Sequence, residues 1–108
     1  MAKQVPPSQV EDMAEILQAL GQPAIGRFFG GWDIRVDGRQ VVMAIGDIIY
    51  LKVGPVLAEE LAAQGGAPFS YAKGEGRVTV KAYYSLPSGV LDGPDILIDW
   101  VRRALRKS

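Results

Sequence analysis

Two turn signals, Asp37-Gly38 and Gly46-Asp47, constrain this chain more than any other feature. An Asp-Gly pair favours a two-residue type I′ turn, because both of its central positions need positive φ angles. The segment before it, WDIRV, alternates apolar and polar residues, which is the period of a half-buried strand. The stretch 27–53 is therefore predicted to form a three-stranded antiparallel meander, around which the rest of the chain is organised.

The register of this meander follows by counting if each turn holds two residues. Counting places Ile34 opposite Val41, Trp32 opposite Met43, and Met43 opposite Tyr50, all on one face. The other face would then carry Asp33, Arg35, Val42, Ala44, Ile49, Leu51 and Val53. We expect helices to cover one face, and the partly apolar open face to suit a partner or a second copy of the chain.

Helical patterns flank the meander. Val10, Met13 and Leu17 recur at helical spacing after Ser8, and Pro55 and Pro94 each suit the first position of a further helix. Two more strands are predicted over 69–73 and 78–84. The expected fold is α+β, a two-layer α/β arrangement with a mainly antiparallel five-stranded sheet and the order α-βββ-α-ββ-α. Residues 1–7 are predicted to form a flexible arm, and 8–108 a single domain.

Composition narrows the function. The 108 residues include no His and no Cys, which excludes thiol nucleophiles, Ser-His-Asp triads and Cys/His zinc sites. Turns and helix starts account for most of the Asp residues, and no carboxylate pair suggests acid–base work or Mg²⁺ binding. Twelve basic and twelve acidic residues cancel, and no segment resembles a signal peptide or a membrane span. We expect a cytoplasmic, non-catalytic protein without cofactor or metal.

Three groups of residues are weighed as sites. Gly30-Gly31 could line a phosphate loop, but no Lys-Ser/Thr follows, so a bulge or close backbone packing beside Trp32 is favoured. The cations near the end of the last helix could contact nucleic acid, yet complementing the helix dipole explains them better. These cations are Arg102, Arg103, Arg106 and Lys107.

A mixed set of cations and aromatics could stack nucleic acid bases. Its members are Arg27, Tyr50, Lys52, Tyr71, Lys81 and Tyr84. Core aromatics with surface lysines are the favoured interpretation, because no paired base-stacking motif is present. A protein partner remains the leading expectation, nucleic acid an alternative and a small ligand a second one.

Several segments, in this order, resemble the TfoX/Sxy N-terminal domain family. They are RFFGGW (27–32), a DG turn, IYLKV (49–53), PFSY (68–71), VKAYYSLP (80–87) and DWVRRAL (99–105). The family is marked by an Arg-x-Phe-Gly-Gly segment, a Tyr-Leu-Lys strand, a Phe-x-Tyr segment and a Tyr-Tyr-x-x-Pro segment. The match covers nearly the whole chain after the first helix.

This resemblance implies a two-layer domain with secretion-chaperone-like topology and a link to bacterial competence regulation, in which full-length family members act as transcription co-regulators rather than enzymes. The resemblance also implies that full-length regulators of the family carry a second, C-terminal helical domain. We expect this chain to lack that domain. The residues expected to contact a partner lie in and beside the matching segments. They are Arg27, Phe28, Phe29, Gly30, Gly31, Trp32, Tyr50, Lys52, Tyr71 and Tyr84.

Overall fold

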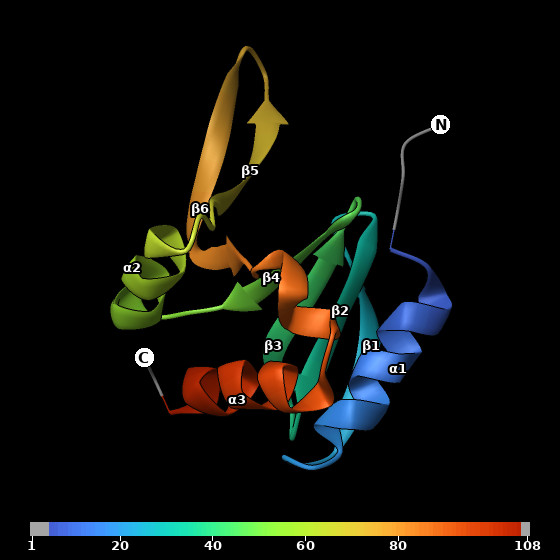
Figure 1. Ribbon diagram of the computed structural model, residues 1–108. Coiled ribbons are helices and arrows are strands. Elements are labelled where there is room, and N and C mark those ends of the chain that lie inside the picture. Colours follow the sequence, from blue (N-terminus) through green and yellow to red (C-terminus); the bar gives the residue numbers. More distant parts are fainter. Residues whose placement is uncertain (1–4, 107–108) are drawn as a thin grey trace.

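The computed structural model describes residues 5–106 as three α-helices and six strands, joined by short turns (Figure 1). The elements are α1 (Pro7–Leu17), β1 (Pro23–Phe28), β2 (Gly31–Val36), β3 (Arg39–Ile45), β4 (Ile48–Lys52), α2 (Pro55–Ala63), β5 (Pro68–Lys73), β6 (Gly76–Ser85), the 3₁₀ turn η1 (Ser88–Leu91) and α3 (Pro94–Leu105). The predicted α+β class is therefore confirmed. The secretion-chaperone-like topology stays a prediction.

The sheet has six strands, not the predicted five, in the order β1-β2-β3-β4-β6-β5, and every neighbouring pair is antiparallel. The strand that was not predicted is β1, most of which precedes the predicted meander of 27–53. Its sequence, PAIGRF, has one β-branched residue and no clear alternation. It becomes a strand because all six of its residues pair with β2, a tertiary effect that local propensity does not report.

The turn chemistry of the meander was predicted correctly. Asp37 and Gly38 have φ angles of 53° and 82°, the pair of positive values that a type I′ turn requires. A second turn of this kind, with Phe29 at 49° and Gly30 at 74°, joins β1 to β2. Gly46 also has a positive φ, and Ile45 pairs with Ile48 across the turn it forms with Asp47.

The predicted register between the first two meander strands is wrong because β3 contains a bulge. After Arg35 pairs with Gln40, Ile34 pairs with Val42, so Val41 is an extra residue in β3. One extra residue reverses every later side chain. Trp32 consequently lies opposite Ala44 and not Met43, while the predicted pairing of Met43 with Tyr50 is confirmed.

This reversal corrects the composition of the two faces. One face packs against all three helices, in a core that includes Met13 and Leu17 of α1, Leu57 and Leu61 of α2, and Leu97, Trp100 and Val101 of α3. Its strand residues include Ile34, Val36, Val42, Ala44 and Leu51. Asp33 and Arg35 were predicted to share this face with Val42 and Leu51, and this prediction is wrong. They lie on the other face, where Asp33 pairs with Met43.

The other face, which we call the helix-free face, has its own apolar cluster around Met43, Tyr50 and Phe69, and no residue of α1, α2 or α3 as described belongs to it. Phe29 in the β1–β2 turn reaches Phe69 and Tyr71 of β5, with ring centroids 5.2 and 5.0 Å apart. Because β1 and β5 are opposite edges of the sheet, the sheet curls around this cluster.

The start of the described chain is attached to the sheet. Val5 is buried and its N–H donates to the Gly46 carbonyl, which ties the start of the described chain to the β3–β4 turn. Residues 1–4 of the predicted arm lie outside the described residues. Within residues 5–106, no helix has the length and apolar character required to cross a bilayer.

Candidate functional site

Six aromatic side chains gather on the helix-free face, and we call them the aromatic cluster. They are Phe28, Phe29, Tyr50, Phe69, Tyr71 and Tyr83. Most neighbouring rings meet edge to face. For example, the ring centroid of Phe28 lies 4.9 Å from that of Phe29 and 5.6 Å from that of Tyr83. This geometry is favoured by the ring quadrupoles and contributes about 0.5–1.5 kcal/mol per pair beyond burial.

The aromatic cluster is buried at its centre and open at its rim. Tyr50 and Phe69 are buried, Phe28, Tyr71 and Tyr83 are half-buried, and Phe29 is 52% exposed. The exposed ring belongs to a residue with φ of 49°, a conformation that costs a non-glycine residue about 1–2 kcal/mol. The backbone of Phe29 is therefore strained, and the ring contacts of Phe29 within the aromatic cluster offset that strain.

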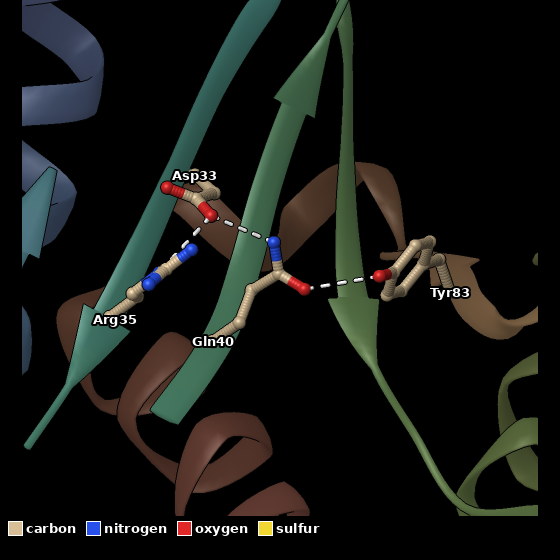
Figure 2. Close-up of polar contacts among 4 residues, drawn as sticks. All are labelled: Asp33, Arg35, Gln40 and Tyr83. Atoms are coloured by element: carbon tan, nitrogen blue, oxygen red, sulfur yellow. Dashed lines mark hydrogen bonds and ion pairs between the residues drawn. The ribbon is translucent and has the colours of Figure 1, made fainter. Parts of the chain in front are cut away.

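A buried carboxylate adjoins the aromatic cluster (Figure 2). Asp33 is 1% exposed, and its Oδ2 atom accepts a hydrogen bond from Nε2 of Gln40 at 2.7 Å. Nε of Arg35 lies 3.5 Å from the same oxygen. Gln40 in turn accepts a hydrogen bond from the Tyr83 hydroxyl at 3.1 Å, so the carboxylate is linked to the rim of the aromatic cluster.

The other carboxylate oxygen of Asp33 has no hydrogen-bond partner within residues 5–106. It lies over Gly26 of β1, where a Cβ atom would be only 2.8 Å away. Glycine at position 26 therefore makes room for the carboxylate. Burial, and secondarily the charge of Asp33, raises the pKa of the Tyr83 hydroxyl above its ordinary value.

The structure brings together some of the predicted contact residues and separates others. Phe28, Phe29, Tyr50 and Tyr71 meet in the aromatic cluster. Lys52 is exposed beside it, opposite Tyr83 in the pairing of β4 with β6. Gly30 occupies the β1–β2 turn next to Phe29.

Four of the predicted residues have other surroundings. Trp32 and Tyr84 pack against the helix-covered core, and the Arg27 guanidinium lies 4.6 Å from the Trp32 ring centroid. Gly31 is a packing residue, because a Cβ there would be 2.0 Å from the Ala44 carbonyl oxygen. Close backbone packing was one of the two favoured interpretations of this glycine, and it is confirmed.

Sequence reasoning missed Phe69, Tyr83, Asp33 and Gln40 as members of the site. The Tyr83-Tyr84 pair could have indicated Tyr83, because consecutive strand residues point to opposite faces and one tyrosine of the pair must lie on each face. Regular alternation over the predicted strand 78–84 would place Tyr84, not Tyr83, on the face of Val80. In the structure, Phe69 pairs with Val80 but Pro68 pairs with Tyr84, so β6 is irregular between these positions and Tyr83 returns to the face of Val80.

The cations of the last helix are also placed. Arg103 forms an ion pair with Glu60 of α2 and lies over the Trp100 ring, 5.0 Å from its centroid. The hydrogen bond to Glu60 raises the pKa of Arg103 above its ordinary value. This pair connects α2 to α3, while Lys107 lies outside the described residues.

No group of three His, Cys, Asp or Glu side chains within residues 5–106 is arranged to hold a metal ion. Among curated proteins, no sequence matches this chain. The sequence model of the TfoX N-terminal domain family matches residues 15–108. Because that match covers nearly the whole chain, the protein belongs to the TfoX N-terminal domain family.

Proposed function

We propose that this domain is a non-catalytic protein-interaction module of bacterial gene regulation, and that it contacts its partner through the exposed rim of the aromatic cluster. The proposed location of the protein is the cytoplasm. The regulatory setting is supported by membership of the TfoX N-terminal domain family and by the competence role that the resemblance to TfoX/Sxy regulators implies.

The observation that carries the proposal is the combination of exposure and backbone strain at Phe29. Its ring is 52% exposed and its φ is 49°. Asn, Asp or Gly would satisfy this turn position at lower cost. A strained position that keeps a large exposed aromatic residue supports a role in binding, and aromatic residues are enriched at the centres of protein interfaces.

The origin of the six rings gives further support. Phe28 and Phe29 come from the RFFGGW segment, Tyr50 from IYLKV, Phe69 and Tyr71 from PFSY, and Tyr83 from VKAYYSLP. These are the segments on which the family resemblance rests. Four segments distant in sequence thus contribute to one surface.

The alternative set of nucleic-acid contacts is divided between the two faces of the sheet. Arg27 pairs with Trp32 in register and Tyr84 packs against the helix-covered core, whereas Tyr50 and Tyr71 belong to the aromatic cluster. Bases stacked on one pair would not reach the other. We therefore favour a protein partner.

The test compares proteins that co-purify with the tagged wild-type domain and with a Phe29→Asn variant from a nuclease-treated bacterial lysate. Asn suits the positive φ and removes only the ring. The matched control is Val56→Asn on α2, an apolar residue that is 68% exposed outside the aromatic cluster. A partner retained by wild type and by the control, but lost from Phe29→Asn, is the expected result.

Light scattering of the three purified proteins tests whether the partner is a second copy of the chain. Self-association that only Phe29→Asn abolishes would identify a homodimer. A partner lost equally from both variants, or retained by both, would contradict the proposed surface, as would a partner removed by the nuclease.

A further inference from the structure

A cavity of about 490 Å³ lies where the β2–β3 turn, the end of β4 and the end of α3 meet. Three cationic residues line it, Arg35, Arg39 and Lys52, and no acidic residue of the described chain does. We propose that this cavity binds a small phosphate-bearing molecule. The proposal is independent of the protein contact at the aromatic cluster.

The three cations come from three adjacent strands. Arg35 belongs to β2, Arg39 begins β3 and Lys52 ends β4. The pairing of β3 with β4 ends at Val42 and Leu51, and the cavity lies beyond this last pair, where the two strands separate. Arg39 therefore reaches it from the side of α3, and Arg35 and Lys52 reach it from the helix-free side. The chain as a whole has no net charge, and this local excess of like charges is unfavourable until an anion offsets it.

Two of the cations are held in place by the protein. Nη1 of Arg39 donates a hydrogen bond to the Leu105 carbonyl oxygen at 3.0 Å. Arg35 is 3.5 Å from Asp33, which Gln40 holds by a hydrogen bond of 2.7 Å. Each contact engages one nitrogen of a guanidinium group that has five N–H donors.

Donors therefore remain for a ligand. Within residues 5–106, the other guanidinium nitrogens of Arg35 and Arg39 and the ammonium of Lys52 have no hydrogen-bond or ion-pair partner. Gln40 also lines the cavity, and its amide nitrogen and oxygen are oriented by their hydrogen bonds to Asp33 and Tyr83. Gln40 therefore forms a fixed part of the cavity wall.

The charge balance stays positive when the neighbouring negative groups are included. Three cations less the Asp33 carboxylate leave a net charge of two. The C-terminal end of the α3 dipole, near Leu105, subtracts about half a unit more. The remaining charge matches that of a phosphate group.

The donor types indicate the ligand class. A guanidinium group can bind two phosphate oxygens with parallel hydrogen bonds, and a lysine ammonium adds a compact charge. The volume falls within the range of about 300–1,000 Å³ found for small-molecule pockets. Val41, Val53 and Leu105 provide an apolar wall for an uncharged part of the ligand.

The proposal is tested by calorimetric titration of the full chain with pyrophosphate, ATP and citrate. Saturable binding of pyrophosphate or ATP is expected, with an affinity that weakens as salt screens the charges. Lys52→Gln and Arg39→Gln are each expected to weaken binding by about tenfold, the loss of one charge-assisted contact. Lys81→Gln and Lys73→Gln, which alter exposed lysines outside the cavity, should change affinity by less than about twofold.

The Lys52 side chain is exposed and has no hydrogen-bond partner within residues 5–106, so Lys52→Gln decides the matter even if Arg39→Gln unfolds. The proposal is overturned if neither phosphate compound binds saturably at millimolar concentration, or if Lys81→Gln weakens binding as much as Lys52→Gln. Citrate binding as tight as that of the phosphate compounds would overturn the ligand class. None of these results bears on the partner assay with Phe29→Asn, so the two proposals fail separately.

Discussion

The buried carboxylate of Asp33 occupies the space that a side chain on Gly26 would need. These residues pair across β1 and β2, and a Cβ at position 26 would be 2.8 Å from Oδ1 of Asp33. The carboxylate cannot easily turn away, because Gln40 holds its other oxygen and the residue is 1% exposed. A one-carbon addition on one strand is therefore opposed by a polar network on the next.

We predict that Gly26→Ala destabilises the domain by about 1–3 kcal/mol, the usual cost of adding a carbon to a packed site. Chemical denaturation measures the change. The matched control is Gly76→Ala on β6, where a Cβ would meet no atom within 4 Å, and this variant should be neutral or slightly stabilising. Equal losses in both variants would show that the carboxylate moves aside at no cost.

The loss in Gly26→Ala should also depend on Asp33. In an Asp33→Ala background the new methyl group meets no carboxylate, so the added cost of Gly26→Ala is expected to fall below about 0.5 kcal/mol. A double-mutant cycle with full additivity would contradict the steric explanation.

A second prediction concerns the Tyr83 hydroxyl, which donates a hydrogen bond to Oε1 of Gln40. Tyr83→Phe removes this bond and is expected to cost about 1 kcal/mol at neutral pH. The control is Tyr71→Phe, because the Tyr71 hydroxyl has no hydrogen-bond partner within the described chain. Denaturation of the two variants should separate them.

The same hydroxyl gives a pH dependence. Burial, with the Asp33 charge second, raises the Tyr83 pKa above 10.0, so the folded protein binds this proton more tightly than the unfolded chain does. The resulting stability is complete below pH 10.0 and is lost as pH rises through the folded pKa. Burial, with Asp47 second, raises the Tyr50 pKa as well, so Tyr83→Phe should keep only part of this alkaline loss. An unchanged alkaline loss in Tyr83→Phe would contradict the assignment.

A third prediction separates the two adjacent glycines of the β1–β2 turn. Gly30→Ala adds a carbon into open space and costs only the positive φ of 74°, about 1 kcal/mol. Gly31→Ala would place a carbon 2.0 Å from the Ala44 carbonyl oxygen, which belongs to the backbone of β3 and cannot rotate away. This variant is expected to cost about 3 kcal/mol or more.

Thermal unfolding of both variants checks the difference. If Gly31→Ala proved the milder change, close approach of the strands would not be the reason for glycine at that position.

Local chemistry explains how much of this fold could be predicted. The type I′ turn at Asp37-Gly38 and the helices opened by Pro55 and Pro94 depend on neighbouring residues, and each was found where expected. β1 and the extra residue Val41 depend on pairing between strands, which no local pattern reports. Because strand residues alternate faces, that one residue decided the placement of Asp33.

The candidate site was partly predictable for the same reason. Phe28 and Phe29 were among the residues expected to contact a partner, and the structure places both in the aromatic cluster. Tyr84 was predicted and Tyr83 was not, and regular alternation does not hold through the irregular part of β6. Irregularities of pairing are decided by the packing of the whole sheet.

The last prediction concerns what Phe29 costs and contributes. Its ring packs on Phe28, Phe69 and Tyr71, with centroids 4.9, 5.2 and 5.0 Å away. Its backbone has φ of 49°, which Asn tolerates and Ala does not. Both Phe29→Asn and Phe29→Ala lose the ring contacts, but only Asn relieves the backbone, so Phe29→Asn should be more stable than Phe29→Ala by about 1 kcal/mol.

Ile48 provides the control for this comparison, because it is 43% exposed in β4 and its φ is not positive. Ile48→Asn should gain nothing over Ile48→Ala, since both residues are poor strand formers. Denaturant midpoints of the four variants give the answer. If Asn and Ala were equivalent at position 29 as well, the backbone there would carry no strain, and exposure alone would remain as the reason to place a partner at Phe29.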